Sequence, residues 1–501
     1  MLNLNDRNLE GIVRPIGNII FGAVHLPTND VYSRSPSPTN DNHHSVTRIA
    51  SAAEALQLGN ISFTKTWDPL LSQVKLFTNL VQNFAEIHPY AKIAVGVLTA
   101  ALYQVVIAQK ERDDKFRKLI HTTTEVFDFL NRMKVADLDG HKQTMKMLAL
   151  QTTECAYFIR DYTKHKSFIV RVGANLLSGT ELNGKIAEYE RKFEQFRTAF
   201  RTNATLNTEI AVVRIAERMN DIDKNLTLDD LPYAKGVRFD RGRQCLPGTR
   251  EKILEQIIEW VNDIEKSRVL VLSGDAGSGK STIAHTISRM FDELNRLGSS
   301  FFFPRDGTQP YRKLFSTITR DLADLESHWK AAAFTTISQS RALRKTGSLL
   351  EQYEEFILKP AKNTHVYFGP ILIVIDALDA ATHLKAERDE LLSLLFSRTT
   401  ELPRNFRILI TTRGDEDIFD ALEHRQNVVW WRMAEILDND SRAHDIGTYF
   451  SKQLSRIPGV EWNEKRRAKL IAAASGDFAW AVSTCAWVKE VGSGHNAADR
   501  L

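Results

Sequence analysis

The amino-acid sequence predicts an α/β domain, a parallel β-sheet with helices on both faces, between an all-α helical bundle and a short helical segment. Short β-branched runs alternate with helical stretches from Arg268 to Trp431, the pattern of a parallel sheet with crossover helices. From Trp67 to about Leu231 there is little Gly or Pro, and apolar residues recur every three to four positions, as amphipathic helices require. After Asp438 the strand pattern stops and helical patterns continue.

Length and composition fit a folded protein of two or three domains. The chain has 501 residues, of which 43% are hydrophobic and 26% charged, which is usual for globular proteins. Its net charge of +4 gives no electrostatic argument for nucleic acid, so no nucleic-acid partner is expected. The three cysteines, Cys155, Cys245 and Cys485, have no metal-binding spacing, and the amino terminus lacks a secretory signal pattern. We expect a cytoplasmic protein.

The amino-terminal third divides into a disordered segment and the helical bundle. From Pro27 to about His44 the sequence is dense in Ser, Pro, Asn and Asp and cannot bury enough apolar surface to order itself. The longest apolar run, Ile93 to Ala108, is shorter than the roughly 18 residues of a membrane span, so we predict a core helix. A further helix is predicted from about His141 to Tyr162. Two apolar stripes mark other helices: Phe116, Ile120, Phe127 and Leu130, and then Ile186, Tyr189, Phe193, Phe196 and Phe200.

Five short runs rich in β-formers are the expected strands of the sheet. Each is flanked by turn residues or by a helical pattern, which favours buried strands over helices at this length. The predicted strands are Arg268 to Ser273, Ser299 to Phe303, Ile371 to Ile375, Arg407 to Thr412 and Val428 to Trp431.

The sequence GDAGSGKST, which follows the first strand, matches the phosphate-loop pattern of two glycines four residues apart followed by Lys and Ser. Because it lies between an apolar strand and a helix, its backbone N–H groups are expected to converge on one anion. Lys280 should face the β and γ phosphates, and the Ser281 hydroxyl should join an Mg²⁺ shell. The predicted nucleotide-binding residues are Gly274, Asp275, Ala276, Gly277, Ser278, Gly279, Lys280, Ser281 and Thr282.

Two later strands end in further candidate residues. ILIVIDALD places Asp376 after an apolar run, as the second Mg²⁺ ligand of a phosphate-loop protein requires. Asp379 is a candidate to orient the attacking water, although an Asp that ends a strand or caps a helix is common. FRILITTR ends in Arg413, which either senses the γ-phosphate or is an ordinary surface arginine. Asp376, Asp379 and Arg413 are therefore the candidate catalytic residues, and Ser281 and Asp376 the candidate metal ligands.

With these elements in this order, residues from about Gly248 to Trp487 resemble the NACHT family of signal-transducing NTPases, members of the STAND class that includes NLR-like proteins, and especially its fungal set. The resemblance is carried by GDAGSGKST, ILIVIDALDA, FRILITTR and the later GDFAWAV. It implies a sheet of strand order 5-1-4-3-2 and a nucleotide switch that is closed with ADP and opens and oligomerises with ATP. Family members often have an acidic residue where this chain has Ala380, so slow hydrolysis is expected. The stretch CLPGTR, from Cys245 to Arg250, is a candidate adenine contact by its place in the family.

The helical region, including EIHPYAKIAVGVLTAALYQVVIAQKERDD, resembles the amino-terminal bundle of fungal NACHT proteins, related to HeLo-like domains and to the bundle of mixed-lineage kinase-like pseudokinases. In these relatives the bundle is a cell-death effector that attacks membranes after clustering. The resemblance implies a homo-oligomer on activation, and it makes the bundle a candidate for membrane contact.

The leading hypothesis is a switch that binds ATP or ADP with Mg²⁺, a slow NTPase that controls self-association of a helical effector. One alternative is a turnover ATPase or kinase, and another is a membrane-acting bundle with a structural nucleotide. ATP is the default because the guanine-reading NKxD pattern is absent. The predicted segments are 1–65, mostly disordered; 66–232, the bundle; 233–265, a linker and a helix before the phosphate loop; 266–440, the NTPase domain; and 441–501, a partial helical subdomain.

Overall fold

In the computed structural model, the described residues all lie in one compact unit, Ser62–Leu501. The predicted disorder near the amino terminus falls outside them. The segment limits drawn from the sequence stay a prediction. The structure describes residues 64–107, 114–133, 139–164, 179–202, 228–306, 310–363, 369–381, 384–422, 425, 427–455, 457 and 462–489.

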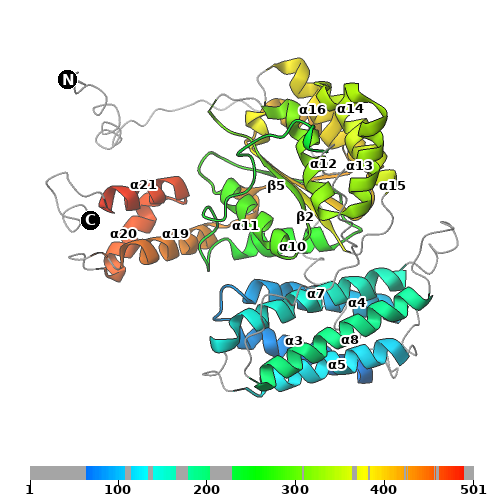
Figure 1. Cartoon of the computed structure of the whole chain (residues 1–501). Helices are drawn as coiled ribbons and strands as arrows, with labels where there is room; N and C mark the ends of the chain where they lie inside the picture. The colour runs from blue at the N-terminus through cyan, green and yellow to red at the C-terminus, as the bar shows by residue number, and fades with distance from the viewer. Residues whose placement is uncertain are drawn as a thin grey trace, which may run out of the picture. The chain divides into compact units, whose positions relative to one another are not determined.

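The amino-terminal part of this unit is a helical bundle (Figure 1). Helix α4 packs against α3 and α7, while α5 packs against α3 and α8. Every residue of the two predicted apolar stripes is buried, so both amphipathic helices are confirmed, and the run from Ile93 falls in α4 as a core helix. Among the described residues, no helix is long and apolar enough to cross a membrane. The bundle helices are α3 (Thr64–Leu80), α4 (His88–Ile107), α5 (Asp114–Asn131), α7 (Lys142–Lys164) and α8 (Gly179–Thr202).

A five-stranded parallel sheet forms the centre of the following part. Its order is β2-β3-β4-β1-β5, which is the predicted order 5-1-4-3-2 read from the other edge. All four neighbouring pairs are parallel, and β1, β3 and β4 are buried along their whole length, as expected of a sheet covered on both faces. The strands are β1 (Val269–Ser273), β2 (Leu297–Phe302), β3 (Ile371–Asp376), β4 (Phe406–Thr412) and β5 (Val428–Arg432).

Helices cover both faces of the sheet because alternate strand residues point to opposite sides. One face joins the apolar cluster of α10 and α11 through Leu270, Val374 and Leu409. The other face joins the cluster of α12, α13 and α16. The other helices of these two layers are short. The elements are α10 (Glu251–Asn262), α11 (Lys280–Glu293), η4 (Pro310–Lys313), α12 (Leu314–Leu325), α13 (Ser327–Gln339), η5 (Arg341–Lys345), α14 (Leu349–Gln352), η6 (Tyr353–Leu358), α15 (Lys359–Asn363), η7 (Leu378–Ala380), α16 (Lys385–Ser397), η8 (Arg398–Glu401) and α17 (Glu416–Leu422).

Arg407 is a charged residue within the apolar pattern of β4, and its side chain is fully buried. Its guanidinium donates to the carbonyls of Trp260 (3.4 Å) and Asp263 (2.6 Å) at the carboxyl end of α10. Carbonyls at a helix end have no partner within the helix and attract a cation. Burial lowers the pKa of Arg407 to about 10. The arginine therefore fixes α10 to the sheet.

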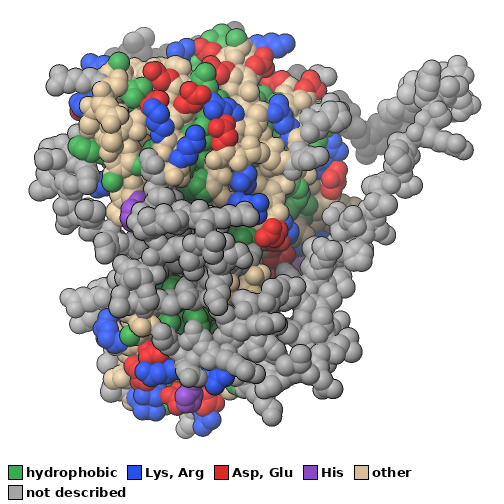
Figure 2. Space-filling model, turned by 90° about the vertical axis from the view of Figure 1, so that its right-hand side faces the viewer, with side chains coloured by type: hydrophobic (Ala, Val, Ile, Leu, Met, Phe, Trp, Pro, Cys, Tyr) green, Lys and Arg blue, Asp and Glu red, His purple; other side chains and the backbone are tan. Residues whose placement is uncertain are grey.

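The last described part is a small group of helices with an apolar cluster of its own. Asp438 accepts a hydrogen bond from the backbone N–H of Ser441 (2.7 Å) and caps the first long helix of this group. The predicted return to helices after Asp438 is confirmed over the described residues. On the face shown in Figure 2, basic and acidic side chains are interspersed over the coloured surface. The carboxyl-terminal helices are α18 (Met433–Ile436), α19 (Asn439–Leu454), α20 (Glu464–Ala474) and α21 (Phe478–Lys489).

Candidate functional site

The predicted phosphate loop connects β1 to α11 at the carboxyl edge of the sheet. Gly277 (φ 79°) and Gly279 (φ 96°) both adopt the left-handed conformation, which a residue with a Cβ atom adopts only at a cost. Gly274 lies close to other groups, since a Cβ atom there would be 3.2 Å from Cβ of Met433 and 3.3 Å from Oγ of Ser278. The glycines thus allow a tight turn directly before the first residue of α11.

Lys280, the first residue of α11, is buried with 7% exposure. Its ammonium group donates to the carbonyls of Gly274 (2.6 Å) and Asp275 (2.8 Å), and it lies 3.3 Å from Oγ of Ser278. These oxygens are all neutral, and among the described residues no carboxylate forms an ion pair with Lys280. Burial lowers its pKa. A buried cation without a carboxylate in contact is suited to an anionic ligand, so the residues of the loop fit a phosphate group.

Asp376 and Ser281, the two predicted metal ligands, lie together. Asp376 ends β3 and is 4% exposed. Its carboxylate accepts a hydrogen bond from the Thr411 hydroxyl, and the Ser281 side chain forms a second hydrogen bond with it. Burial raises the pKa of Asp376, and these hydrogen bonds oppose the increase. A hydroxyl beside a carboxylate is suited to Mg²⁺, which takes one or two protein carboxylates and completes its shell with nucleotide and water oxygens.

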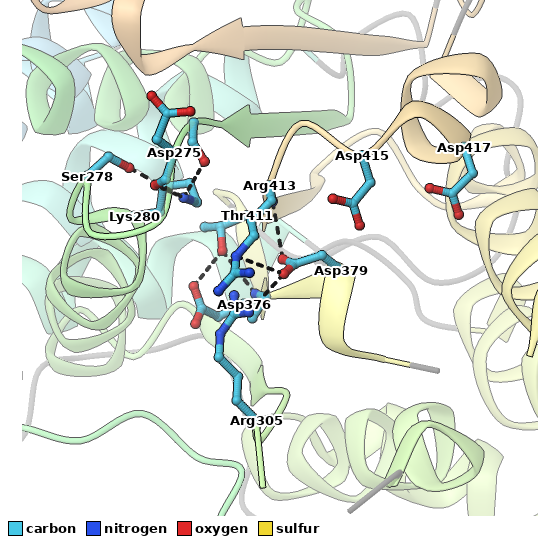
Figure 3. Close-up of polar contacts among 12 residues, drawn as sticks. Asp275, Ser278, Lys280, Arg305, Asp376, Asp379, Thr411, Arg413, Asp415 and Asp417 are labelled. Atoms are coloured by element: carbon cyan, nitrogen blue, oxygen red, sulfur yellow. Dashed lines mark hydrogen bonds and ion pairs between the residues drawn. The ribbon is translucent and has the colours of Figure 1, made fainter. Parts of the chain in front are cut away.

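Asp379 lies at the same edge of the sheet, where two arginines contact its carboxylate (Figure 3). Oδ1 accepts a hydrogen bond from the backbone N–H of Arg413 (3.2 Å). Oδ2 is 3.0 Å from Nη1 of Arg305 and 3.5 Å from Nε of Arg413. The Asp379 side chain is only 5% exposed, and Ala377 before it adopts a left-handed φ of 58°. The structure therefore brings two of the candidate catalytic residues, Asp379 and Arg413, into contact.

Arg305 is the site residue that sequence reasoning missed. It follows β2, whose Phe302 pairs with Asp376 in the sheet. The N–H of Phe303 donates to the Asp376 carbonyl (3.0 Å) and continues this pairing beyond the strand. The carboxyl ends of parallel strands meet at one edge, so a charged residue after each predicted strand was the signal that could have identified Arg305.

Arg250, the last residue of the CLPGTR stretch, joins the loop to the carboxyl-terminal helices. Its Nη2 donates to the Ser278 carbonyl (2.9 Å), and its Nη1 lies 3.4 Å from the Asp445 carboxylate. Its guanidinium also lies 5.1 Å from the ring centre of Phe478, the third residue of the GDFAWAV stretch. Arg250 is 6% exposed. Two stretches quoted for the resemblance therefore meet at the phosphate loop, and the base contact stays a prediction.

Three cations lie near two carboxylates at this edge of the sheet. Lys280, Arg305 and Arg413 face the carboxylates of Asp376 and Asp379, and the positive neighbours lower the pKa of Lys280 while these two carboxylates raise it. Among the described residues, no group of three or more His, Cys, Asp or Glu side chains could hold a metal ion by itself. The arrangement is suited to an anion that brings its own metal ligands.

Comparison with protein families gives a match to part of the chain. Residues 248–413 match the profile of a protein family described as Nephrocystin 3, N-terminal. The match covers about a third of the chain, begins at the glycine of CLPGTR and ends at Arg413. It therefore includes the loop, Asp376, Asp379 and Arg305. No curated protein matches the chain at a significant level.

Proposed function

We propose that this chain is a nucleotide-operated signalling switch that binds ATP or ADP with Mg²⁺ at the loop from Gly274 to Thr282. The buried ammonium of Lys280, which contacts only neutral oxygens, is the observation that carries the proposal. Lys280 and the loop N–H groups would bind the phosphates, while Ser281 and Asp376 would hold Mg²⁺. The match to the Nephrocystin 3, N-terminal profile over residues 248–413 and the sheet order support a phosphate-loop NTPase of the NACHT and STAND type.

The geometry around Asp379 supports a switch more than a turnover enzyme. A residue that orients an attacking water needs a free carboxylate oxygen. Asp379 instead accepts the Arg413 N–H and contacts two guanidinium groups. The next residue is Ala380, which offers no second carboxylate. Arg413 still holds Asp379 through its backbone N–H, so this arrangement favours slow hydrolysis, as a switch with long-lived states requires.

Contacts at the far end of α11 support control of the helical bundle by the nucleotide. The helix carries Lys280 and Ser281 in its first turn and Glu293 at its last residue. The Glu293 carboxylate forms an ion pair with Lys146 of α7 (2.6 Å) and accepts a hydrogen bond from Tyr90 of α4. We therefore propose that the bundle is the effector of the switch, comparable to that of fungal NACHT proteins, and that ATP favours its self-association.

The test measures the molar mass of the full chain by size exclusion with light scattering, in Mg²⁺ with either ATPγS or ADP. ATPγS should give a higher oligomer and ADP a monomer. Lys280→Ala should bind both nucleotides roughly tenfold more weakly, or worse, because it removes a charged hydrogen-bond donor.

The matched control for that variant is Lys252→Ala. Lys252 forms an exposed ion pair with Asp438, 3.3 Å away, so its replacement should leave both affinities and the oligomer unchanged. Equal molar masses with the two nucleotides would contradict the switch. An unchanged affinity in Lys280→Ala would contradict the binding site.

A further inference from the structure

Arg305 is placed by the sheet and not by a flexible surface contact. The hydrogen bond from Phe303 N–H to the Asp376 carbonyl (3.0 Å) fixes the chain two residues before it. Pro304 between them restricts the backbone further. Arg305 is therefore held beside the strand that carries the candidate metal ligand.

The guanidinium of Arg305 has N–H donors that its ion pair with Asp379 does not use. Its described ion pair is with Asp379, where Nη1 lies 3.0 Å from Oδ2, and its side chain is 45% exposed. A guanidinium group has five N–H donors in a planar fork. Arg413 approaches the same Oδ2 from β4 at 3.5 Å. Two cations thus share one carboxylate oxygen, which leaves capacity for a second anion.

Arg305 also acts on the rest of the site through its charge. In Figure 3, Lys280 lies on one side of Asp376, and Arg305 lies on the other. Its positive charge lowers the pKa of Asp376 and also that of Lys280, although burial is the largest influence on both groups. Arg305 is therefore close enough to affect groups on both sides of the candidate phosphate site.

Resting on the proposed function, we propose that Arg305 binds the terminal phosphate of a nucleoside triphosphate and selects triphosphate over diphosphate. The loop N–H groups would bind the phosphates that both ligands share, and Lys280 would reach the β and γ phosphates from the side of the loop. Arg305 lies beyond Asp376 as seen from Lys280, where the additional phosphate supplies the extra anion. Its exchange of partner from Asp379 to phosphate makes the loop after β2 a sensor of nucleotide state.

The experiment measures the affinities of the full chain for ATPγS and for ADP in Mg²⁺, by competition with a fluorescent ADP analogue. Arg305→Gln should weaken ATPγS binding about tenfold or more, because a charged hydrogen-bond donor is lost, and should change ADP binding less than about twofold. Arg305→Lys should recover part of the selectivity, since it keeps the charge and loses the fork.

Arg312→Gln is the matched control, because Arg312 follows on η4, is 57% exposed and pairs with Glu387. Arg312→Gln should bind ATPγS and ADP with the same affinities as the unaltered chain. Equal effects of Arg305→Gln on the two nucleotides, or no effect, would overturn the inference. If Arg305→Gln does not fold, Arg305→Lys decides, and an unchanged ATPγS-to-ADP ratio then overturns it. Failure of the unaltered chain to bind either nucleotide would instead overturn the proposed function.

Discussion

Burial raises the pKa of Asp321, a residue of α12, to about 6. Its carboxyl group accepts hydrogen bonds from Ser299 of β2 (2.6 Å) and from Tyr233 (2.9 Å). These bonds favour the ionised form but do not offset the loss of water around the charge. The folded protein therefore takes up a proton at Asp321 at a higher pH than the unfolded chain, whose ordinary value is 3.8.

The stabilisation that follows is present below pH 4 and is lost as the pH rises through 6. Asp321→Asn removes this dependence. We expect the variant to gain stability relative to the unaltered chain as the pH rises from about 4 to 6, by up to roughly 3 kcal/mol. Thermal unfolding midpoints measured at several pH values check this. Asp420→Asn, an equal charge change at an exposed position of α17, should show no such trend, and parallel curves for all three proteins would contradict the prediction.

At the level of single residues, the sequence predicted the candidate site residues that lie within one motif. Lys280 and Ser281 have fixed spacing within the loop, and Asp376 follows an apolar run that identifies it as the end of a strand. Arg305 lies in no such motif, and its place after a predicted strand was its one signal, because its partner Asp379 is 74 positions away and only the sheet brings them together. The Asp379 ion pairs were not predictable for the same reason.

At the scale of elements, the phosphate loop packs directly against the start of α21. A Cβ atom built on Gly277 would lie 2.5 Å from Cβ of Ala479 and 3.6 Å from the Asp477 carboxylate. Gly277 also has a left-handed φ of 79°. Its lack of a side chain thus serves both the turn and the contact.

Gly277→Ala should lower the thermal unfolding midpoint for both reasons. The control is Gly236→Ala, because Gly236 has nearly the same φ of 77° and no heavy atom within 4 Å of its Cβ position. Backbone strain alone costs roughly 1 kcal/mol, so Gly277→Ala should lose more stability than Gly236→Ala. Adding Ala479→Gly to Gly277→Ala should recover this additional loss of stability, because it removes the Cβ atom that the new side chain would meet. Equal losses at the two glycines would show that the contact with α21 contributes nothing.

The strands were predictable because buried parallel strands are short apolar runs in the sequence. All five are confirmed, with ends within two residues of the prediction. The largest difference is at β2, which begins at Leu297 and not at Ser299. Gly298 obscured this start, since glycine is a poor strand former. It is needed there because a Cβ atom would lie 2.7 Å from the Ile371 side chain on β3.

For the whole molecule, one contact between the bundle and the sheet domain is a buried ion pair. Arg296 donates from Nε (3.0 Å) and from Nη2 (2.6 Å) to the two carboxylate oxygens of Glu154 on α7. Both side chains are at most 7% exposed. The Arg296 guanidinium also lies 5.0 Å from the ring centre of Tyr157. A bidentate pair in this setting fixes the orientation of its two partners.

Arg296→Met should cost about 3–5 kcal/mol, because it leaves Glu154 charged, buried and without its partner. The double variant Glu154→Leu with Arg296→Met should recover most of this loss, since neither member of the pair is then left charged and buried without its partner. Unfolding midpoints of both variants check the prediction. Lys118→Met is the control for an exposed pair, with Lys118 73% exposed and 2.7 Å from Glu190, and it should change stability far less than Arg296→Met, because solvent screens an exposed pair. A double variant no more stable than Arg296→Met would contradict it.

Composition and pattern predicted the bundle and the sheet domain separately, and the interface between them was not predictable. Glu154 and Arg296 are 142 positions apart, and the local sequence around each gives no sign that it is buried in an ion pair. The local patterns reflect the burial of one helix face or one strand. They carry no information on which distant charges meet.

Helix α11 connects the candidate phosphate site to the interface with the bundle. It runs without a break from Lys280 to Glu293, about 20 Å at the usual rise per residue. Its first turn faces the candidate phosphate site, and its last residue contacts Lys146 and Tyr90 of the bundle. A continuous helix resists compression along its axis. We therefore expect a displacement of the loop along this axis to reach the contacts with Lys146 and Tyr90.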